Sequence, residues 1–498
     1  MHLSTIYDMP IIGGGINGTG IARDAAGRGL RVILVEQDDL AAHTSSASTK
    51  LIHGGLRYLE QFEFMLVRKA LQEREVILRN APHITWPLRF VMPHNDTMRP
   101  EWMIRAGLFL YDNLARREQL PDSETVRLTE HPAGAPLKTE FTTGFVYSDG
   151  WVDDARLVVL NALDAQERGA KICTRTQCIG GQRRDGLWEI GLHDGATQQQ
   201  RTIRARALVN AAGPWVARLM NHQLHMPSPY QLRLVKGSHI IVPRLFDHPY
   251  AYIFQNPDNR IIFAIPYQHA FTLIGTTDVE YHGDLTQVRI DDDEVQYLCA
   301  MANRYFNTQI TPATVVHSYA GVRPLLEDAA GEASSVTRDY LLELDRNGAP
   351  LLSVFGGKIT TFRKLAEEAL QQLAPLFDAS DHPWTRDTPL PGGDMLGADI
   401  DIFLIGLAQR CPWLPERLRT RLARAYGSRV YRLLGSAQSL TDLGSEIAPQ
   451  VYECELRYSR DVEFARSGDD FLWRRSKLGL HLNAEECAAV AGWFEQNN

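Results

Sequence analysis

The feature that most constrains this chain is a glycine-rich turn near its N-terminus, enclosed by two apolar runs. Residues 11–12 lead into Gly13-Gly14-Gly15-Ile16-Asn17-Gly18, a helical pattern follows, and residues 32–35 form a second apolar run that ends at Glu36. Glycines at this spacing allow a tight turn and close approach of backbone N–H groups to a pyrophosphate, while a carboxylate after the second strand accepts hydrogen bonds from ribose hydroxyls. The segment therefore predicts a strand–helix–strand unit that binds a dinucleotide.

A glycine-rich turn alone often only closes a loop, so the prediction depends on the strands, the helix and the acidic residue around it. Pro10 departs from the ideal pattern, because it lies where the first strand should run and proline cannot donate a hydrogen bond to a neighbouring strand. We expect Pro10 to be the first residue of that strand, or the strand to begin after it.

Composition limits the classes of function. The chain has 498 residues, of which 44% are hydrophobic and 22% charged, as in ordinary multidomain globular proteins. Its 52 basic and 60 acidic residues give a formal net charge of −8, whereas nucleic-acid-binding proteins usually carry a basic excess. The six cysteines lack the two-residue spacing of zinc or thioredoxin-type sites. We therefore expect no nucleic acid, no metal and reduced thiols in the cytoplasm.

The chain shows no sign of crossing a membrane. Its N-terminus lacks the basic and apolar regions of a secretory signal, and no apolar run approaches the roughly 18 residues that a spanning helix needs. Attachment to a membrane surface stays open at this point.

The patterns along the chain divide it into regions. Residues 151–240 are expected to alternate between helix and strand, residues 232–279 show the short runs and breaks of an antiparallel sheet, and residues 351–355 form another buried strand before Gly356-Gly357 and a helix. The proline- and glycine-containing stretch 379–394 is typical of a linker, and helical patterns follow it.

Several longer motifs together resemble the flavin-dependent, aerobic type of glycerol-3-phosphate dehydrogenase. The resemblance runs from about residue 8 to the C-terminus. It rests on GGGINGTGIARDAAGRGL, TSSASTKLIHGGLRYLE, YSDGWVDDARL, NAAGPWV, LVKGSHIIVP, IGTTDVEY, GVRPL and SVFGGKITTFRKLAE, in that order.

The resemblance implies an α/β FAD-binding fold of the D-amino-acid-oxidase type, with an antiparallel-sheet substrate domain and an all-helical C-terminal domain. We expect residues 1–385 to form the oxidoreductase region, with its FAD part at about 1–85, 150–230 and 345–385 and its substrate part at about 86–149 and 231–344. Residues 386–498 would form the helical domain. The implied reaction oxidises sn-glycerol 3-phosphate to dihydroxyacetone phosphate and passes the electrons to ubiquinone or menaquinone, at the cytoplasmic face of the cell membrane.

A phosphorylated substrate needs fixed cations, and arginine offers a planar fork for a phosphate. Arg57, Arg323 and Lys358 each lie beside glycine or proline, and the resemblance places them at the substrate. Taken singly, each would more often be a surface cation. Thr276 or Thr277 is expected to bind the substrate, and Tyr58 to add a donor to the phosphate.

Oxidation of an alcohol also requires a group that accepts the hydroxyl proton, and imidazole titrates nearest neutral pH. Most of the 16 histidines will be exposed or satisfied in the core. His239 and His53 lie in glycine-containing motifs, and we favour His239 slightly, with Lys358 as a group that could share the role.

Three further segments are expected to contact FAD beside the first glycine-rich turn. The last of them, residues 356–361, can point a helix N-terminus at the flavin ring and stabilise its reduced form. The expected cofactor-binding residues are Gly13, Gly14, Gly15, Asn17, Gly18, Glu36, Thr44, Ser45, Ser46, Ser48, Lys50, Leu51, Gly213, Trp215, Gly356, Gly357, Ile359 and Thr360.

Two stretches could dock on membrane lipids to meet a quinone. Arg417, Arg421 and Arg424 share one face of a basic helical pattern, which suits anionic headgroups, although a solvated face or a contact in a homodimer is an alternative. Residues 102–117 contain Trp102 and Phe109 and suit an interface or ordinary core packing equally well.

Two rival functions stay open. An oxidase on the same scaffold would pass electrons to oxygen, and a non-catalytic flavin-binding sensor would need no phosphate clamp. The presence of Arg57, Arg323 and Lys358 argues against the sensor.

Overall fold

The computed structural model describes residues 6–95, 98–258, 260–326, 339–377 and 379–497. Its first layer is a sheet of six strands, in which five are parallel and β19 is an antiparallel edge. In spatial order the strands are β19 (Leu341–Asp345), β20 (Leu351–Phe355), β12 (Leu208–Asn210), β2 (Met9–Ile12), β3 (Val32–Val35) and β8 (Lys171–Cys173).

The predicted strand–helix–strand unit is β2, α1 (Ile16–Gly27) and β3. Pro10 is the second residue of β2, so neither expected position was correct; the pairing of β2 with β12 begins only after it, at Ile11. Pro10 is in register with Ile33 of β3 but lies outside the pairing with β12, which involves Ile11 and Ile12.

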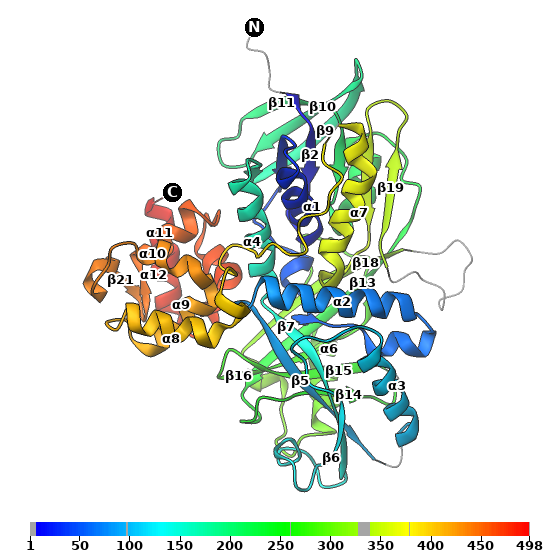
Figure 1. Cartoon of the computed structure of the whole chain (residues 1–498), viewed down its shortest axis with the longest axis vertical. Helices are drawn as coiled ribbons and strands as arrows, with labels where there is room; N and C mark the ends of the chain where they lie inside the picture. The colour runs from blue at the N-terminus through cyan, green and yellow to red at the C-terminus, as the bar shows by residue number, and fades with distance from the viewer. Residues whose placement is uncertain (1–5, 96–97, 259, 327–338, 378, 498) are drawn as a thin grey trace.

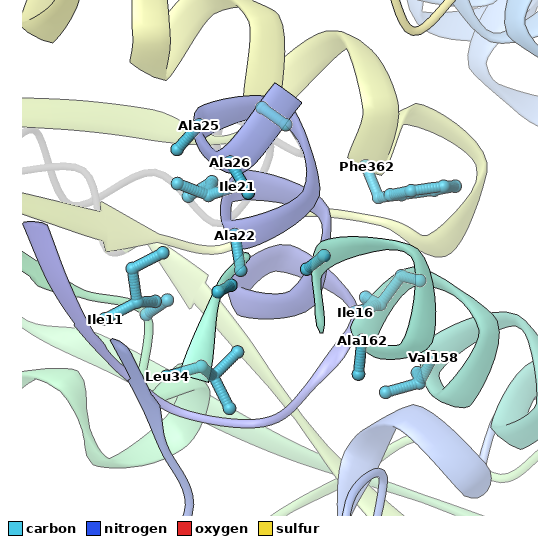
Figure 2. Packing of buried hydrophobic residues seen from close by; sticks show 14 of the residues in the cluster. Ile11, Ile16, Ile21, Ala22, Ala25, Ala26, Leu34, Val158, Ala162 and Phe362 are labelled. Carbon is cyan, nitrogen blue, oxygen red and sulfur yellow. The ribbon is translucent and has the colours of Figure 1, made fainter. Parts of the chain in front are cut away.

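Three helices pack around the parallel sheet: α1, α4 (Asp154–Glu167) and α7 (Phe362–Leu373). Figure 2 shows alanines of α1 among Ile11 and Leu34 of the strands, Val158 of α4 and Phe362 of α7. The helices approach closely because α1 offers small side chains toward them; a Cβ at Gly20 would lie 2.8 Å from the Phe362 ring.

The second large layer is a ten-stranded sheet, mostly antiparallel as predicted, with a parallel pair at β14 and β5. Its path runs β17 (Val279–Glu280), β13 (Leu232–Pro243), β16 (Phe271–Gly275), β15 (Ile261–Tyr267), β14 (Ala251–Gln255), β5 (Thr85–His94), β7 (Thr143–Val152) and β4 (Leu51–Ile52), with β18 (His317–Leu326) on β13 and β6 (Glu124–Arg127) on β7. Helices α2 (Phe64–Asn80), α3 (Glu101–Asn113) and α6 (Asp292–Asn303) belong to this part.

A third, four-stranded sheet corrects one expectation. Residues 151–240 do not simply alternate helix and strand, because β9 (Thr176–Arg184), β10 (Leu187–Asp194) and β11 (Gln200–Ala205) form an antiparallel meander, which β1 (Ile6–Tyr7) joins in parallel. Its buried face packs Trp188, Ile190 and Leu192 over the parallel sheet.

The C-terminal part is mainly helical, as expected, and lies to one side of the two sheets (Figure 1). Its helices are α8 (Ile400–Arg410), α9 (Glu416–Tyr426), α10 (Val430–Leu434), α11 (Glu453–Asp461) and α12 (Ala484–Asn497), with one small hairpin of β21 (Glu446–Ala448) and β22 (Val451–Tyr452). Within the described ranges, no helix is both long and apolar enough to cross a bilayer.

The stretch 379–394 connects the two parts but is packed against the first of them. The Trp384 ring lies against Gly27 of α1 and within cation–π distance of Arg23 and Arg168, at 5.0 and 4.0 Å. The connection therefore holds the helical part in place.

Candidate functional site

A long cleft opens at the carboxyl ends of the parallel strands. Ten of the predicted cofactor residues line it, and they come from four separate segments of the chain. They are Gly13, Gly15, Asn17, Glu36, Thr44, Ser45, Gly213, Trp215, Gly356 and Gly357. This position at the strand ends is where open α/β sheets bind their ligands.

The first glycine-rich turn is shaped by backbone contacts that exclude side chains. Gly13 has a φ of +118°, and a Cβ there would lie 2.4 Å from the Ala211 carbonyl oxygen. A Cβ at Gly18 would lie 2.0 Å from the Gly13 oxygen. The turn brings the start of α1 to the cleft, where the Ile16 N–H donates to Ser45 Oγ at 3.0 Å.

Glu36 supports this turn as well as facing the cleft. Its carboxylate accepts the Gly14 N–H at 2.6 Å and the Asp38 N–H at 2.9 Å. Burial raises the pKa of Glu36, and these backbone hydrogen bonds oppose that effect. Since each carboxylate oxygen has a second lone pair, ribose hydroxyls can still bind there.

Eight predicted cofactor residues lie outside the cleft lining: Gly14, Gly18, Ser46, Ser48, Lys50, Leu51, Ile359 and Thr360. Lys50 is buried, and its Nζ lies 2.8 Å from Asp154 Oδ1. Ser48 donates its hydroxyl to the same carboxylate at 2.7 Å. These two side chains therefore hold the protein's own structure together.

Sequence reasoning missed several residues that line the cleft: Gln37, His43, Thr176, Gln177, Cys178, Arg218, Gln223, Thr286 and Pro324. Thr176, Gln177 and Cys178 follow β8, a strand of the same parallel sheet, so their place after a strand was the available signal. The His43 ring packs against Trp215 in a tilted arrangement with ring centroids 4.7 Å apart, a contact that no local pattern indicates.

One end of the cleft gathers part of the predicted substrate-binding set. Lys358 Nζ lies 4.1 Å from the Tyr58 ring centroid, and the His53 N–H donates to Thr360 Oγ1 at 3.3 Å. The motif HGGLR, at the end of β4, thus lies beside the turn that carries Gly356, Gly357 and Lys358. Arg57 in the same motif is exposed.

Arg323 reaches this region from β18. Strand β18 passes close to the Gly356 turn, since a Cβ added at Gly356 would lie 3.6 Å from the carbonyl oxygen of Pro324, the residue that follows Arg323. The Arg323 guanidinium donates to the Thr277 carbonyl at 3.0 Å and lies 3.4 Å from Asp278, and its side chain is 42% exposed. It is thus anchored by one edge while the rest stays open to a ligand.

The two predicted threonines differ in their roles. Thr277 is buried, donates its hydroxyl to Glu294 at 2.6 Å and accepts the Ser238 N–H at 2.9 Å, so it holds β13 to α6. Thr276 is partly exposed, and its hydroxyl donates to the Thr277 carbonyl at 3.1 Å. Of the two, Thr276 is the one open to a substrate.

The two candidate bases are both neutral imidazoles in different surroundings. Burial lowers the pKa of His53; Asp149 opposes this effect, and the charges of Lys358 and Arg74 lower the pKa further. Burial also holds the pKa of His239 well below 6.5, helped by Lys50 and Arg323. His53 is partly open, whereas His239 is 2% exposed and its Nε2 is hydrogen-bonded to Thr49 Oγ1 at 2.9 Å.

Comparison with known proteins identifies the fold and its relatives. A sequence profile described as "FAD dependent oxidoreductase" matches residues 8–363, and one described as "C-terminal domain of alpha-glycerophosphate oxidase" matches residues 383–493. A glycerol-3-phosphate dehydrogenase of Pseudomonas aeruginosa is 55% identical over 100% of this chain and 96% of its own length. A D-erythritol 1-phosphate dehydrogenase of Brucella abortus is 50% identical over 99% and 98%.

A crystal structure of the glycerol-3-phosphate dehydrogenase from Bacillus halodurans complexed with FAD superimposes with a TM-score of 0.80 at 28% identity, covering 99% of this chain and 91% of that one.

The cleft fits FAD on its own geometry. Asn17 donates its amide to the Gly356 carbonyl at 3.2 Å, but its buried Oδ1 has no hydrogen-bond partner within the described part of the chain. A Cβ at Gly357 would lie 2.6 Å from Asn17 Nδ2, so no side chain fits where these two segments of the cleft lining meet. An unsatisfied acceptor in a glycine-lined cleft is what a cofactor donor would complete.

Proposed function

Because this chain belongs to the FAD-dependent oxidoreductase family and carries the C-terminal domain of alpha-glycerophosphate oxidases, we propose that it oxidises sn-glycerol 3-phosphate to dihydroxyacetone phosphate. The observation that carries the proposal is the cation pair beside the cleft. Lys358 lies in the turn that follows β20 and contains Gly356, and Arg323 lies on β18, next to Pro324, whose carbonyl oxygen is close to Gly356. Fixed cations at this end of the cleft suit a phosphate-bearing alcohol.

The chemistry that bound FAD would supply is a hydride acceptor for the hydrogen on C2 of the substrate. The chain itself must hold the phosphate and remove the proton of the C2 hydroxyl. Arg323 and Lys358 serve the first task, with Thr276 and Tyr58 as neutral donors. For the second we now favour His53 over His239, because His239 is enclosed and its Nε2 is engaged by Thr49. A neutral imidazole accepts the proton directly.

The decisive experiment is an anaerobic one. Purified holoprotein is mixed with sn-glycerol 3-phosphate while the visible flavin absorbance is followed. We expect the oxidised flavin band to bleach, with one dihydroxyacetone phosphate formed for each flavin. A flavin that stays oxidised would refute the dehydrogenase.

A second substrate has a specific observation in its favour. The D-erythritol 1-phosphate dehydrogenase is 50% identical over nearly the whole chain, close to the 55% of the glycerol-3-phosphate dehydrogenase. Both substrates offer a phosphate to the same cations. Comparing kcat/KM for the two phosphates decides between them, and we expect the three-carbon substrate to be preferred.

We further propose a quinone as the electron acceptor, with oxygen as the alternative. The support is a group of seven exposed apolar side chains on neighbouring elements, near the 56–61 turn and the start of α2 and along α3, which contacts that turn. They are Phe62, Phe64, Met65, Trp102, Met103, Phe109 and Leu110. A group of this kind suits docking on lipid, where quinones dissolve. Reoxidation of the reduced enzyme by a short-chain quinone analogue, and slow peroxide formation in air, would support the quinone.

The basic helix α9 is the weaker candidate for docking. Arg421 is ion-paired with Glu455 at 2.6 Å, and Arg424 lies over the Trp86 ring at 5.0 Å, facing the oxidoreductase region. Only Arg417 of the predicted basic face is exposed. Figure 1 shows α3 on the opposite side of the view from these C-terminal helices.

A further inference from the structure

A series of buried and partly buried charged and polar groups connects the C-terminal part to the substrate region. It begins at Lys477, whose side chain is 6% exposed. Lys477 Nζ donates to the Trp473 carbonyl at 2.8 Å and lies 3.3 Å from Asp153 Oδ1. Asp153 caps α4 by accepting the Arg156 N–H at 3.2 Å. A residue of the C-terminal part thus contacts the start of a helix in the FAD-binding part.

Asp154, the next residue, carries the contact onward. Its fully buried carboxylate lies 2.8 and 3.0 Å from Lys50 Nζ and accepts both the N–H and the hydroxyl of Ser48. Burial lowers the pKa of Lys477, and the charge of Lys50 lowers it further. The two ammonium groups therefore lie beside two adjacent carboxylates, of which Asp154 is buried and Asp153 is 19% exposed.

This arrangement determines the backbone of residues 48–50. Lys50 adopts a φ of +61°, a left-handed conformation that a residue with a long side chain rarely takes without tertiary support. The Lys50 N–H donates to Ser48 Oγ at 2.9 Å, and Nζ donates to the Ser46 carbonyl at 3.0 Å. The ion pair with Asp154 is the support that the conformation requires.

Thr49, between these two residues, holds His239. Its hydroxyl is 2.9 Å from His239 Nε2, and the imidazole stacks on Tyr319 with ring centroids 4.8 Å apart. Tyr319 in turn donates to the Ser48 carbonyl at 2.9 Å. His239 packs beneath Gly275, where a Cβ would lie 2.1 Å from its Cδ2, next to Thr276. The 48–50 segment thus contacts His239, which packs beneath Gly275 and Thr276 of the substrate region.

A second contact ties the same C-terminal segment to the substrate region. Trp473 stacks on His317 of β18 with ring centroids 4.1 Å apart and an interplanar angle of 12°. Strand β18 also carries Tyr319 and Arg323. The C-terminal part therefore contacts both the strand that presents Arg323 and the helix start that holds Lys50.

We propose that Lys477 is a positioning residue for the substrate region, acting through Asp153, the Asp154–Lys50 pair and Thr49 on His239. The C-terminal part thereby contributes to the geometry of a site, although none of its described residues, 386–497, lines the cleft. The inference rests on the proposed function, because its kinetic consequence is a change in flavin reduction by sn-glycerol 3-phosphate.

The test compares Lys477→Met with Lys477→Arg and Asp153→Asn as FAD-loaded, full-length proteins. Methionine keeps the length but removes the charge, arginine restores a cation, and asparagine keeps the helix cap while it removes the carboxylate. We expect Lys477→Met and Asp153→Asn to lower the anaerobic rate of flavin reduction about tenfold, which is less than the roughly 100-fold that a 1 Å misplacement of the reacting groups can cost, because His239 supports the substrate region from below. We expect Lys477→Arg to recover most of that rate.

The matched control is Arg429→Met, which breaks an ion pair between the C-terminal part and the other end of α4, at Glu167. It disturbs the contact between the same two parts away from the 48–50 segment. If Lys477 acted only by holding the parts together, Arg429→Met would slow flavin reduction as much as Lys477→Met does. That result would overturn the proposal.

Hydrogen exchange separates this proposal from the substrate assignment. In the resting holoenzyme, Lys477→Met should speed amide exchange in residues 48–52, while Lys477→Arg and Arg429→Met leave it near the wild-type rate. If sn-glycerol 3-phosphate does not reduce the flavin of the wild type, the proposed function is refuted. The exchange pattern still tests the positioning role in that case. Unchanged exchange in Lys477→Met would refute the positioning role.

Discussion

At the scale of single residues, the roles of the charged groups depend on what faces them. Lys50 and Arg323 are both cations in motifs expected to bind ligands. Lys50 is fully buried in an ion pair with Asp154, whereas the guanidinium of Arg323 is partly exposed beside Thr277 and Asp278. A buried ion pair has no capacity left for a ligand, and a half-exposed guanidinium keeps several donors free. This difference supports the proposal that Arg323, and not Lys50, binds the phosphate.

Replacement of Arg323 by alanine should lower kcat/KM for sn-glycerol 3-phosphate by about 10- to 100-fold, because a charge-assisted hydrogen bond contributes about 1.5–3 kcal/mol. Steady-state kinetics with a quinone analogue measure the effect. Arg127→Ala, at an arginine whose side chain is 81% exposed, serves as the control and should leave kcat/KM unchanged. A wild-type kcat/KM in Arg323→Ala would remove Arg323 from the site.

The pH profile tests the choice of His53 as base. Since burial lowers the pKa of His53 below 6.5, the imidazole stays neutral through the neutral range. We therefore expect kcat/KM to be level above pH 6.5 and to fall only in more acidic solution, as His53 becomes protonated. His53→Asn should lower kcat by about 100- to 10,000-fold and remove the acidic limb. If His239→Asn did this instead, the base would be His239.

At the scale of elements, α3 and α9 show the limit of amphipathic patterns. Both have apolar residues at helical spacing, but α9 buries Leu418, Leu422 and Tyr426, and its arginines Arg421 and Arg424 contact Glu455 and Trp86. Helix α3 buries only Ile104, Leu108 and Tyr111 and leaves Trp102 and Phe109 69% and 68% exposed. Exposed aromatic side chains on one helix mark a contact surface.

Phe109→Asp should weaken binding to anionic lipid vesicles by about tenfold or more, because inserting a phenyl side chain into an apolar phase contributes about 1.5–3 kcal/mol. Co-sedimentation with vesicles measures the bound fraction. Arg417→Gln, at the exposed arginine of α9, is the comparison and should change binding only slightly. The reverse order of the two variants would point to α9 as the docking helix.

At the scale of the whole molecule, buried ion pairs join the C-terminal part to the FAD-binding part. Arg156 of α4 pairs with Glu463 in a bidentate arrangement at 2.5 and 2.8 Å and also donates to the Ala425 carbonyl. Both side chains are almost completely buried. Separation of the two parts would therefore break this ion pair and expose both charged groups to water.

Glu463→Gln should destabilise the protein by about 3–5 kcal/mol, because it leaves the Arg156 charge buried without its counterion. Thermal unfolding of the holoprotein measures the loss as a lower Tm. Arg429→Met, at a pair that solvent reaches, should lower Tm much less. Equal shifts for the two variants would show that burial adds nothing to the Arg156–Glu463 contact.

The sequence by itself determined the features that depend on neighbours in the chain. The βαβ unit, the glycine-rich turns, Glu36, the antiparallel runs after residue 232 and the helical C-terminal part were all predictable, because turn geometry and hydrophobic period act over a few residues. The motif resemblance added the flavin-dependent family, which the comparisons confirm.

Only the tertiary structure decided which polar side chains are already paired. The partners of Lys50, Arg421 and Thr277 lie 104, 34 and 17 residues away in the chain, and no local pattern reveals them. The same holds for the enclosure of His239 beneath Gly275 and for the meander that replaces an expected alternation. Burial and long-range pairing determine whether a side chain is charged and whether it is available to a ligand. The chemistry of each candidate residue therefore depends on contacts that form only when the chain has folded.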